Sequence, residues 1–138
     1  MNQKRGVAIL GSTGSIGTQA LDVIREQSSR FRVEVITAQR QSDLLIRQAL
    51  EFLPNAVVIG DVSRYEEVRA ALADQPIKVF AGPEALEQVV QMEDIDIVLT
   101  AMVGYAGLRP TLAAIQAGKS IALANKETLV VAGDLVTQ

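Results

Sequence analysis

The predicted fold is decided by the stretch Val7-Ala8-Ile9-Leu10-Gly11-Ser12-Thr13-Gly14-Ser15-Ile16-Gly17, in which an apolar strand runs into three glycines spaced G-x-x-G-x-x-G. A helix with apolar periodicity follows. We expect Gly11 to allow a sharp turn, Gly14 to let a phosphate approach the backbone, and Gly17 to let the helix pack closely. The free N–H groups of the first helical turn would then face an anion. The spacing alone also fits a tight turn without a ligand, but the strand and helix around it favour a nucleotide-phosphate site.

Composition narrows the classes of protein that this chain fits. Its 138 residues are enough for one domain, and 49% of them are hydrophobic, as expected for strands buried on both faces. The net charge of −3 gives no support to nucleic-acid binding, and the lack of cysteine and histidine excludes disulfides, a thiolate nucleophile and a histidine base. Residues 1–5 lead directly into the first strand, with no leader or apolar span, so we expect a cytoplasmic protein with no membrane partner.

Strand and helix signals alternate along the whole chain. We expect strands at residues 7–10, 33–38, 56–59, 77–80, 97–100 and 120–124, with helices between them and another helix beginning near 127–131. Ser63 and Glu66 have the spacing of a capping box, and Gly82-Pro83 is a typical helix start. Leu108, Leu112 and Ile115 mark a further helix, which Gly118 ends. The alternation predicts an α/β fold, a Rossmann-like doubly wound, mainly parallel sheet with helices on both faces, and one domain over 1–138.

The end of the second predicted strand bears on the choice of cofactor. In dinucleotide-binding folds an acidic residue there selects NAD, whereas a basic residue pairs with the 2′-phosphate of NADP. The chain reads Gln39-Arg40-Gln41 at this point, about 20 residues after the glycine turn. An arginine fork can bind two phosphate oxygens, and two neutral donors flank it. We therefore expect NADP(H) rather than NAD(H).

A third polar segment, Asn125-Lys126-Glu127, follows the sixth predicted strand. Ligands in open α/β sheets bind outside the carboxyl ends of the strands, the edge where the glycine turn also lies. The segment fits an ordinary helix start with surface charges. It also fits a site in which two of the residues hold the nicotinamide and Lys126 holds an anionic substrate.

Together these segments resemble the 1-deoxy-D-xylulose 5-phosphate reductoisomerase family over essentially the whole chain. The resemblance is carried, in order, by the turn at 10–17, the residues 38–41, Val103-Gly104-Tyr105-Ala106-Gly107-Leu108, Pro110-Thr111-Leu112-Ala113-Ala114-Ile115, Ala117-Gly118-Lys119 and Leu123-Ala124-Asn125-Lys126-Glu127. It implies an NADPH-dependent enzyme that makes 2-C-methyl-D-erythritol 4-phosphate in non-mevalonate isoprenoid biosynthesis. This chain would be its N-terminal NADPH-binding domain.

The resemblance also implies residue roles. The cofactor pyrophosphate region would be contacted by Thr13, Gly14, Ser15 and Ile16, the 2′-phosphate by Gln39, Arg40 and Gln41, the nicotinamide side by Asn125 and Glu127, and the substrate by Lys126. The family often has Gly or Asn at the position of Gln39 and Asn at that of Gln41. Its Mg²⁺ or Mn²⁺ is held by acidic residues beyond the Asn-Lys-Glu segment, so no metal ligand and no catalytic residue is expected within this chain. The family is usually a homodimer.

Two other classes remain open from the residues themselves. Another NADP-dependent dehydrogenase could share the turn, but a short-chain reductase needs Tyr-x-x-x-Lys, and Tyr65 and Tyr105 are followed at that spacing by Arg69 and Arg109. A semialdehyde dehydrogenase needs a cysteine, which is absent from these 138 residues but could lie beyond residue 138. A non-catalytic nucleotide-sensing domain would need no substrate anchor such as Lys126.

Overall fold

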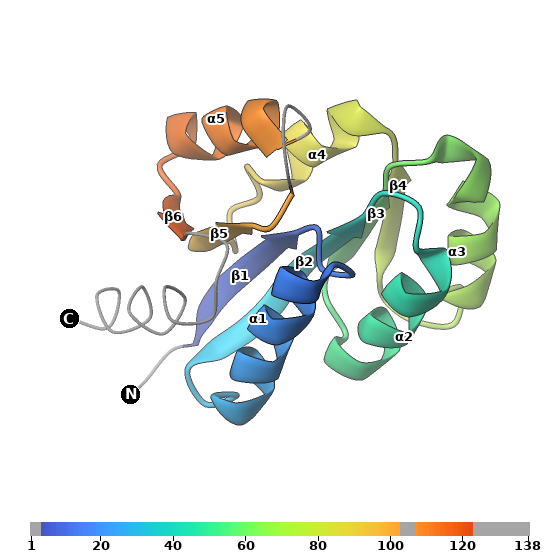
Figure 1. Cartoon of the computed structure of the whole chain (residues 1–138), viewed down its shortest axis with the longest axis horizontal. Coiled ribbons are helices and arrows are strands. Elements are labelled where there is room, and N and C mark those ends of the chain that lie inside the picture. Colours follow the sequence, from blue (N-terminus) through green and yellow to red (C-terminus); the bar gives the residue numbers. More distant parts are fainter. Residues whose placement is uncertain (1–3, 103–106, 123–138) are drawn as a thin grey trace.

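A parallel sheet of six strands forms the centre of the molecule (Figure 1). The structure is a computed structural model that describes residues 4–102 and 107–122. The strands are β1 (Arg5–Leu10), β2 (Phe31–Ala38), β3 (Ala56–Ile59), β4 (Lys78–Ala81), β5 (Ile97–Thr100) and β6 (Ser120–Ala122). The predicted strands are confirmed with shifts of a few residues at their ends. The predicted end of the last strand, at 123–124, and the helix near 127–131 lie outside the described residues.

Helices cover both faces of this sheet, as the sequence predicts (Figure 1). They are α1 (Ser15–Glu26), α2 (Ser42–Phe52), the short 3₁₀ helix η1 (Val62–Arg64), α3 (Tyr65–Ala71), α4 (Pro83–Val89) and α5 (Leu108–Gln116). The buried side chains of α1, α2 and α3 pack into one core, and those of α4 and α5 pack into a second core across the sheet. None of the helices in residues 4–102 and 107–122 has the length and apolarity that crossing a membrane requires.

The strands supply side chains to both cores because successive residues of a strand point to opposite faces. In β1, Val7 and Ile9 join the core under α1 and α2, whereas Ala8 and Leu10 join the core under α4 and α5. All four side chains are fully buried. Burial on both faces explains why β1 reads as a continuous apolar run in the sequence.

The order of the strands creates a switch point. The sheet runs β4-β3-β2-β1-β5-β6, so the chain moves outward from β1 to β4 and then crosses back to place β5 beside β1. The connections after β1 and β5 therefore diverge at the carboxyl ends of two neighbouring strands. In open parallel sheets this divergence leaves a crevice, which is the usual place for a ligand.

The predicted capping box at Ser63 and Glu66 is wrong. The cap is Asp61, whose Oδ1 accepts hydrogen bonds from Ser63 N, at 3.0 Å, and Ser63 Oγ, at 2.6 Å. The chain first forms η1, and α3 begins only at Tyr65, without a side-chain cap. Glu66 instead accepts hydrogen bonds from Arg69 one turn later. An aspartate two residues before a serine forms a tight local turn, and this geometry prevails over the longer box.

The helix marked by Leu108, Leu112 and Ile115 is present as α5, and Gly118 follows its end with a φ of +81°. Its apolar stripe, however, is about half exposed. The residues that α5 buries are Pro110 and Ala114. Small residues at the contact allow α5 to lie close to the sheet, and they leave the larger side chains at its surface.

Candidate functional site

A hollow of about 270 Å³ lies at the switch point, between the connections that follow β1, β2 and β5. Its lining consists of Gly11, Thr13, Gly14, Thr37, Ala38, Gln39, Leu86, Ala101 and Met102. Three of the predicted cofactor-binding residues, Thr13, Gly14 and Gln39, thus meet in one cavity although they belong to two different strand connections. Backbone hydrogen bonds tie the turn to both neighbours, from Ser12 N to Thr37 O and from Ala101 N to Leu10 O, each at 2.8 Å.

The three glycines of the turn serve different purposes. Gly11 has a φ of +88°, which favours glycine and allows the chain to leave β1 sharply. A Cβ on Gly17 would lie 2.6 Å from Ser12 Cα and 2.8 Å from Ser12 C, so glycine lets α1 pack directly on the turn. Gly14 has an ordinary φ of −76°, and among the described residues outside its two chain neighbours a Cβ there would meet no atom closer than Gly11 O at 4.0 Å. Packing within residues 4–102 and 107–122 does not require glycine at position 14, and the open space beside it is compatible with the approach of a ligand.

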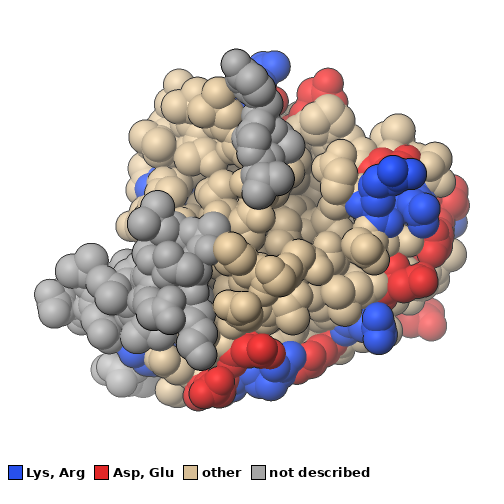
Figure 2. All heavy atoms as spheres, in the orientation of Figure 1, with Lys and Arg blue, Asp and Glu red and all other residues tan. Residues whose placement is uncertain are grey.

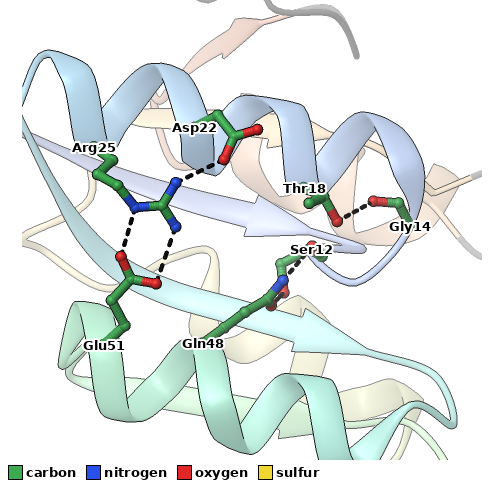
Figure 3. Close-up of polar contacts among 7 residues, drawn as sticks. All are labelled: Ser12, Gly14, Thr18, Asp22, Arg25, Gln48 and Glu51. Atoms are coloured by element: carbon green, nitrogen blue, oxygen red, sulfur yellow. Dashed lines mark hydrogen bonds and ion pairs between the residues drawn. The ribbon is translucent and has the colours of Figure 1, made fainter.

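A buried polar network holds the glycine turn from behind. The amide of Gln48, on α2, donates to Ser12 O at 2.9 Å and accepts from Ser12 Oγ at 2.7 Å (Figure 3). Thr37 Oγ1 accepts from Gly11 N at 2.9 Å. Ser12, Thr37 and Gln48 are all buried. The backbone of the turn is therefore held in shape by buried side chains.

The first turn of α1 opens toward solvent beside the hollow. Ser15 and Ile16 are both exposed, and Ile16 is 37% accessible although it is apolar. Thr18 Oγ1 donates to Gly14 O at 2.7 Å, which fixes the start of the helix (Figure 3). The leading N–H groups of a helix have no partner within the helix, and together with the helix dipole they attract an anion. Ser15 and Ile16 thus lie at a helix start whose free N–H groups could face an anion.

The segment predicted to select the cofactor, residues 39–41, follows β2 at the same edge of the sheet. Gln39, Arg40 and Gln41 are all exposed, and Gln39 alone among them lines the hollow. The Arg40 side chain is 75% exposed, and its Nε lies 3.9 Å from Asp61 Oδ2. Arg40 is therefore free to meet a phosphate group while a carboxylate keeps it near the rim.

Asp61 connects two arginines at this rim. Arg64, at the end of η1, approaches the same Asp61 Oδ2 with its Nε at 3.5 Å. The hydrogen bonds from Ser63, together with the two guanidinium groups, hold the pKa of Asp61 below its usual range. Figure 2 shows basic and acidic side chains next to one another on the side of the molecule where α2 and α3 lie. The carboxylate of Asp61 therefore stays ionised and keeps both cations in position.

Part of the predicted site is not described. Asn125, Lys126 and Glu127, together with residues 103–106 of the motif after β5, lie outside the described residues. Within residues 4–102 and 107–122, acidic side chains form no group of three that could hold a metal ion. The predicted cofactor-binding residues that lie within the described part of the chain are Thr13, Gly14, Ser15, Ile16, Gln39, Arg40 and Gln41.

Sequence reasoning missed four residues that shape this site: Thr37, Gln48, Asp61 and Arg64. Gln48 is the only buried glutamine of the described chain, and a polar residue on the apolar face of α2 is the signal that could have found it. The sequence gives no such signal for Asp61 and Arg64, because Ser63 and Glu66 beside them have the spacing of a capping box. Their position depends on the pairing of β2 with β3, which brings the two connections together.

A glycine turn at the switch point of a doubly wound parallel sheet defines a Rossmann-type α/β domain. The family model described as 1-deoxy-D-xylulose 5-phosphate reductoisomerase matches residues 7–133. This chain belongs to that family.

Individual relatives agree with this assignment. The reductoisomerase of Bacteroides fragilis is 60% identical over 136 residues, covering 99% of this chain and 35% of the relative. That of Symbiobacterium thermophilum is 51% identical, covering 97% of this chain and 36% of the relative. This chain thus spans about a third of the length of the relatives that it matches.

Solved structures show the same likeness. The Zymomonas mobilis reductoisomerase in complex with NADPH has a TM-score of 0.84 at 43% identity, over 96% of this chain and 35% of that chain. A reductoisomerase solved with NADPH, fosmidomycin and magnesium has a TM-score of 0.83 at 41% identity, over 96% of this chain and 33% of that chain. The family match favours the reductoisomerase over the other dehydrogenases and the nucleotide-sensing domain considered from the sequence.

Proposed function

We propose that this chain is the NADPH-binding domain of a reductoisomerase that converts 1-deoxy-D-xylulose 5-phosphate into 2-C-methyl-D-erythritol 4-phosphate in non-mevalonate isoprenoid biosynthesis. The observation that carries the proposal is the hollow at the switch point, where Gly14 faces open space beside the start of α1. Membership of the family and the NADPH recorded with the Zymomonas mobilis relative support it.

The residues present fit a dinucleotide phosphate. Gly14 leaves room that a Cβ would fill, and the N–H groups at the start of α1 offer donors to a pyrophosphate. In this proposal Thr13, Gly14, Ser15 and Ile16 hold the pyrophosphate region. Gln39, Arg40 and Gln41 surround the adenosine 2′-phosphate, where the exposed guanidinium of Arg40 can bind two oxygens.

The remaining assignments concern the reacting end of the cofactor. Asn125 and Glu127 would contact the nicotinamide side, and Lys126 would bind the anionic substrate beside it. NADPH supplies the hydride that the reduction needs. The part played by this chain is to hold the cofactor, orient it toward the substrate and exclude competing positions, which is a contribution of proximity.

The metal site and the remaining domains that the reaction requires belong, in this proposal, to a protein longer than this chain. Reductoisomerase structures have been solved with magnesium, and hard divalent cations bind clustered carboxylate oxygens. We assign the ligands for Mg²⁺ or Mn²⁺ to sequence that follows this segment in the longer relatives, together with the remaining catalytic and C-terminal domains. A cytoplasmic homodimer that binds neither nucleic acid nor membrane is the state that we propose for the whole enzyme.

Calorimetric titration of the 138-residue chain with NADPH and NADH tests the proposal. We expect NADPH to bind more tightly, because an arginine and no acid follows β2 at residues 39–41. Equal affinities would contradict the assignment of Arg40 to the 2′-phosphate. Failure of a folded chain to bind either dinucleotide would contradict the proposed function itself.

A further inference from the structure

The connection after β3 brings a second arginine to the proposed 2′-phosphate subsite. β2 and β3 run parallel and pair in register up to Ala38 and Ile59, so the segments that follow them leave the sheet side by side. Backbone hydrogen bonds continue the pairing, from Gly60 N to Ala38 O at 2.8 Å and from Asp61 N to Gln39 O at 2.9 Å. The segments that contain Arg40 and Arg64 are therefore tied together before either side chain is considered.

Asp61 then aligns the two cations. Its Oδ1 is occupied by the two hydrogen bonds from Ser63, which leaves Oδ2 to face the arginines. Arg40 Nε and Arg64 Nε lie 3.9 Å and 3.5 Å from that one oxygen. Two guanidinium groups thus converge on a single anionic oxygen at the rim of the site.

The hydrogen-bonding capacity of Arg64 is far from used. A guanidinium group carries five N–H donors. Among the described residues, the Arg64 side chain makes one long hydrogen bond, from Nη1 to Ser42 Oγ at 3.4 Å, and Nη1 lies 3.9 Å from Glu67 Oε1. Its Nε is enclosed by protein and has no hydrogen-bond partner. The side chain is still 40% exposed, so its outer N–H groups can reach an incoming acceptor.

We propose that Arg64 is a second phosphate-binding cation of the adenosine 2′-phosphate subsite, acting beside Arg40, and that Asp61 positions both. The inference rests on the proposed function and adds a residue that determines cofactor specificity. A phosphate monoester carries between one and two negative charges near neutral pH and offers three acceptor oxygens, more than one arginine fork can satisfy. The ribose of NADH lacks this group, so Arg64 discriminates between the two cofactors.

The test compares Arg64→Ala with Arg69→Ala, which removes an arginine one turn along α3 whose partner is Glu66. NADPH, NADH and adenosine 2′,5′-bisphosphate are titrated into each 138-residue variant, and circular dichroism melting is recorded on the same samples. We expect Arg64→Ala to weaken NADPH and the bisphosphate about tenfold and to leave NADH within about twofold. Arg69→Ala should change none of the three affinities.

A second variant covers the case in which Arg64→Ala does not fold. Arg64→Lys keeps the charge but loses the planar fork, so a folded Arg64→Lys chain should bind NADPH more weakly than the unsubstituted chain and bind NADH equally well, and unchanged NADPH binding by it would overturn the inference. Unchanged NADPH binding by a folded Arg64→Ala chain would overturn the inference while leaving the proposed function intact. Equal weakening of NADPH and NADH would overturn it as well, because the role of Arg64 would then be structural. Absence of binding to the unsubstituted chain would instead remove the proposed function.

Discussion

Replacing Gly14 and Gly17 by alanine, one at a time, should separate ligand binding from packing in the glycine turn. At Gly17 the new Cβ would lie within 2.6–2.8 Å of Ser12 backbone atoms and even closer to Gly11 O. These are backbone atoms of a turn held by buried hydrogen bonds, so they cannot move aside cheaply. At Gly14 the nearest atom of the described residues, chain neighbours aside, is Gly11 O at 4.0 Å, and the φ of −76° suits any residue.

The magnitudes follow from these contacts. Overpacking at Gly17 costs about 3 kcal/mol, and the better helix propensity of alanine returns about 1 kcal/mol, so the free energy of unfolding should fall by about 2 kcal/mol. For a domain of this size that corresponds to a Tm lower by about 7 °C. At Gly14 the weaker N-cap and the smaller entropy of the unfolded chain nearly cancel, and the net change should stay within about 0.5 kcal/mol.

Thermal unfolding and NADPH titration on the same samples decide the matter. Gly17→Ala should melt early, whereas Gly14→Ala should melt normally and lose NADPH affinity, because its methyl group occupies the space proposed for the pyrophosphate. An unchanged Tm for Gly17→Ala would show that α1 does not pack on the turn. Normal NADPH binding by Gly14→Ala would show that the phosphate lies elsewhere.

Four further outcomes are expected. Arg40→Glu should lower the preference for NADPH over NADH about tenfold in calorimetric titration, whereas Arg47→Glu, the same charge change on α2, should not. Gln48→Leu removes two buried hydrogen bonds to the turn, so chemical denaturation should show a free energy of unfolding lower by about 1–3 kcal/mol, and NADPH should bind more weakly. Unchanged stability and unchanged NADPH binding would show that Gln48 does not hold the turn in shape. Hydrogen bonds from Arg25 lower the pKa of Glu51. The Arg25–Glu51 ion pair therefore stabilises the fold fully above the pKa of the unfolded carboxyl, near pH 4.3, and this stabilisation is lost as the pH falls through the lower pKa of the folded state. Glu51→Gln should therefore cost about 0.5 kcal/mol at pH 7 and less below pH 4, because the pair is exposed; an equal cost at both pH values would contradict the linkage. Finally, the 138-residue chain should show no metal-dependent oxidation of NADPH with 1-deoxy-D-xylulose 5-phosphate at the NADPH absorbance band, and turnover above a blank would mean that the chemistry lies within this chain.

The amino-acid sequence by itself determined the architecture. Continuous apolar runs such as 7–10 and 56–59 are typical of strands buried on both faces, and the amphipathic segments between them predict helices on both faces. The glycine spacing also predicted the turn after the first strand, because the backbone freedom at Gly11 and the close packing at Gly17 are local requirements. Where two local signals competed, as at Asp61 and Ser63, the sequence did not decide between them.

Tertiary structure alone decided which residues support the site. Gln48 lies 36 residues from Ser12, and only the packing of α2 beside the turn brings its amide to the Ser12 hydroxyl and carbonyl. Arg40 and Arg64 belong to separate strand connections, and the parallel pairing of β2 with β3 places both against Asp61. Such contacts depend on the order of the strands, which hydrophobic periodicity does not encode. The same periodicity marks the stripe of α5 without showing that it is exposed, because burial depends on what packs against a face.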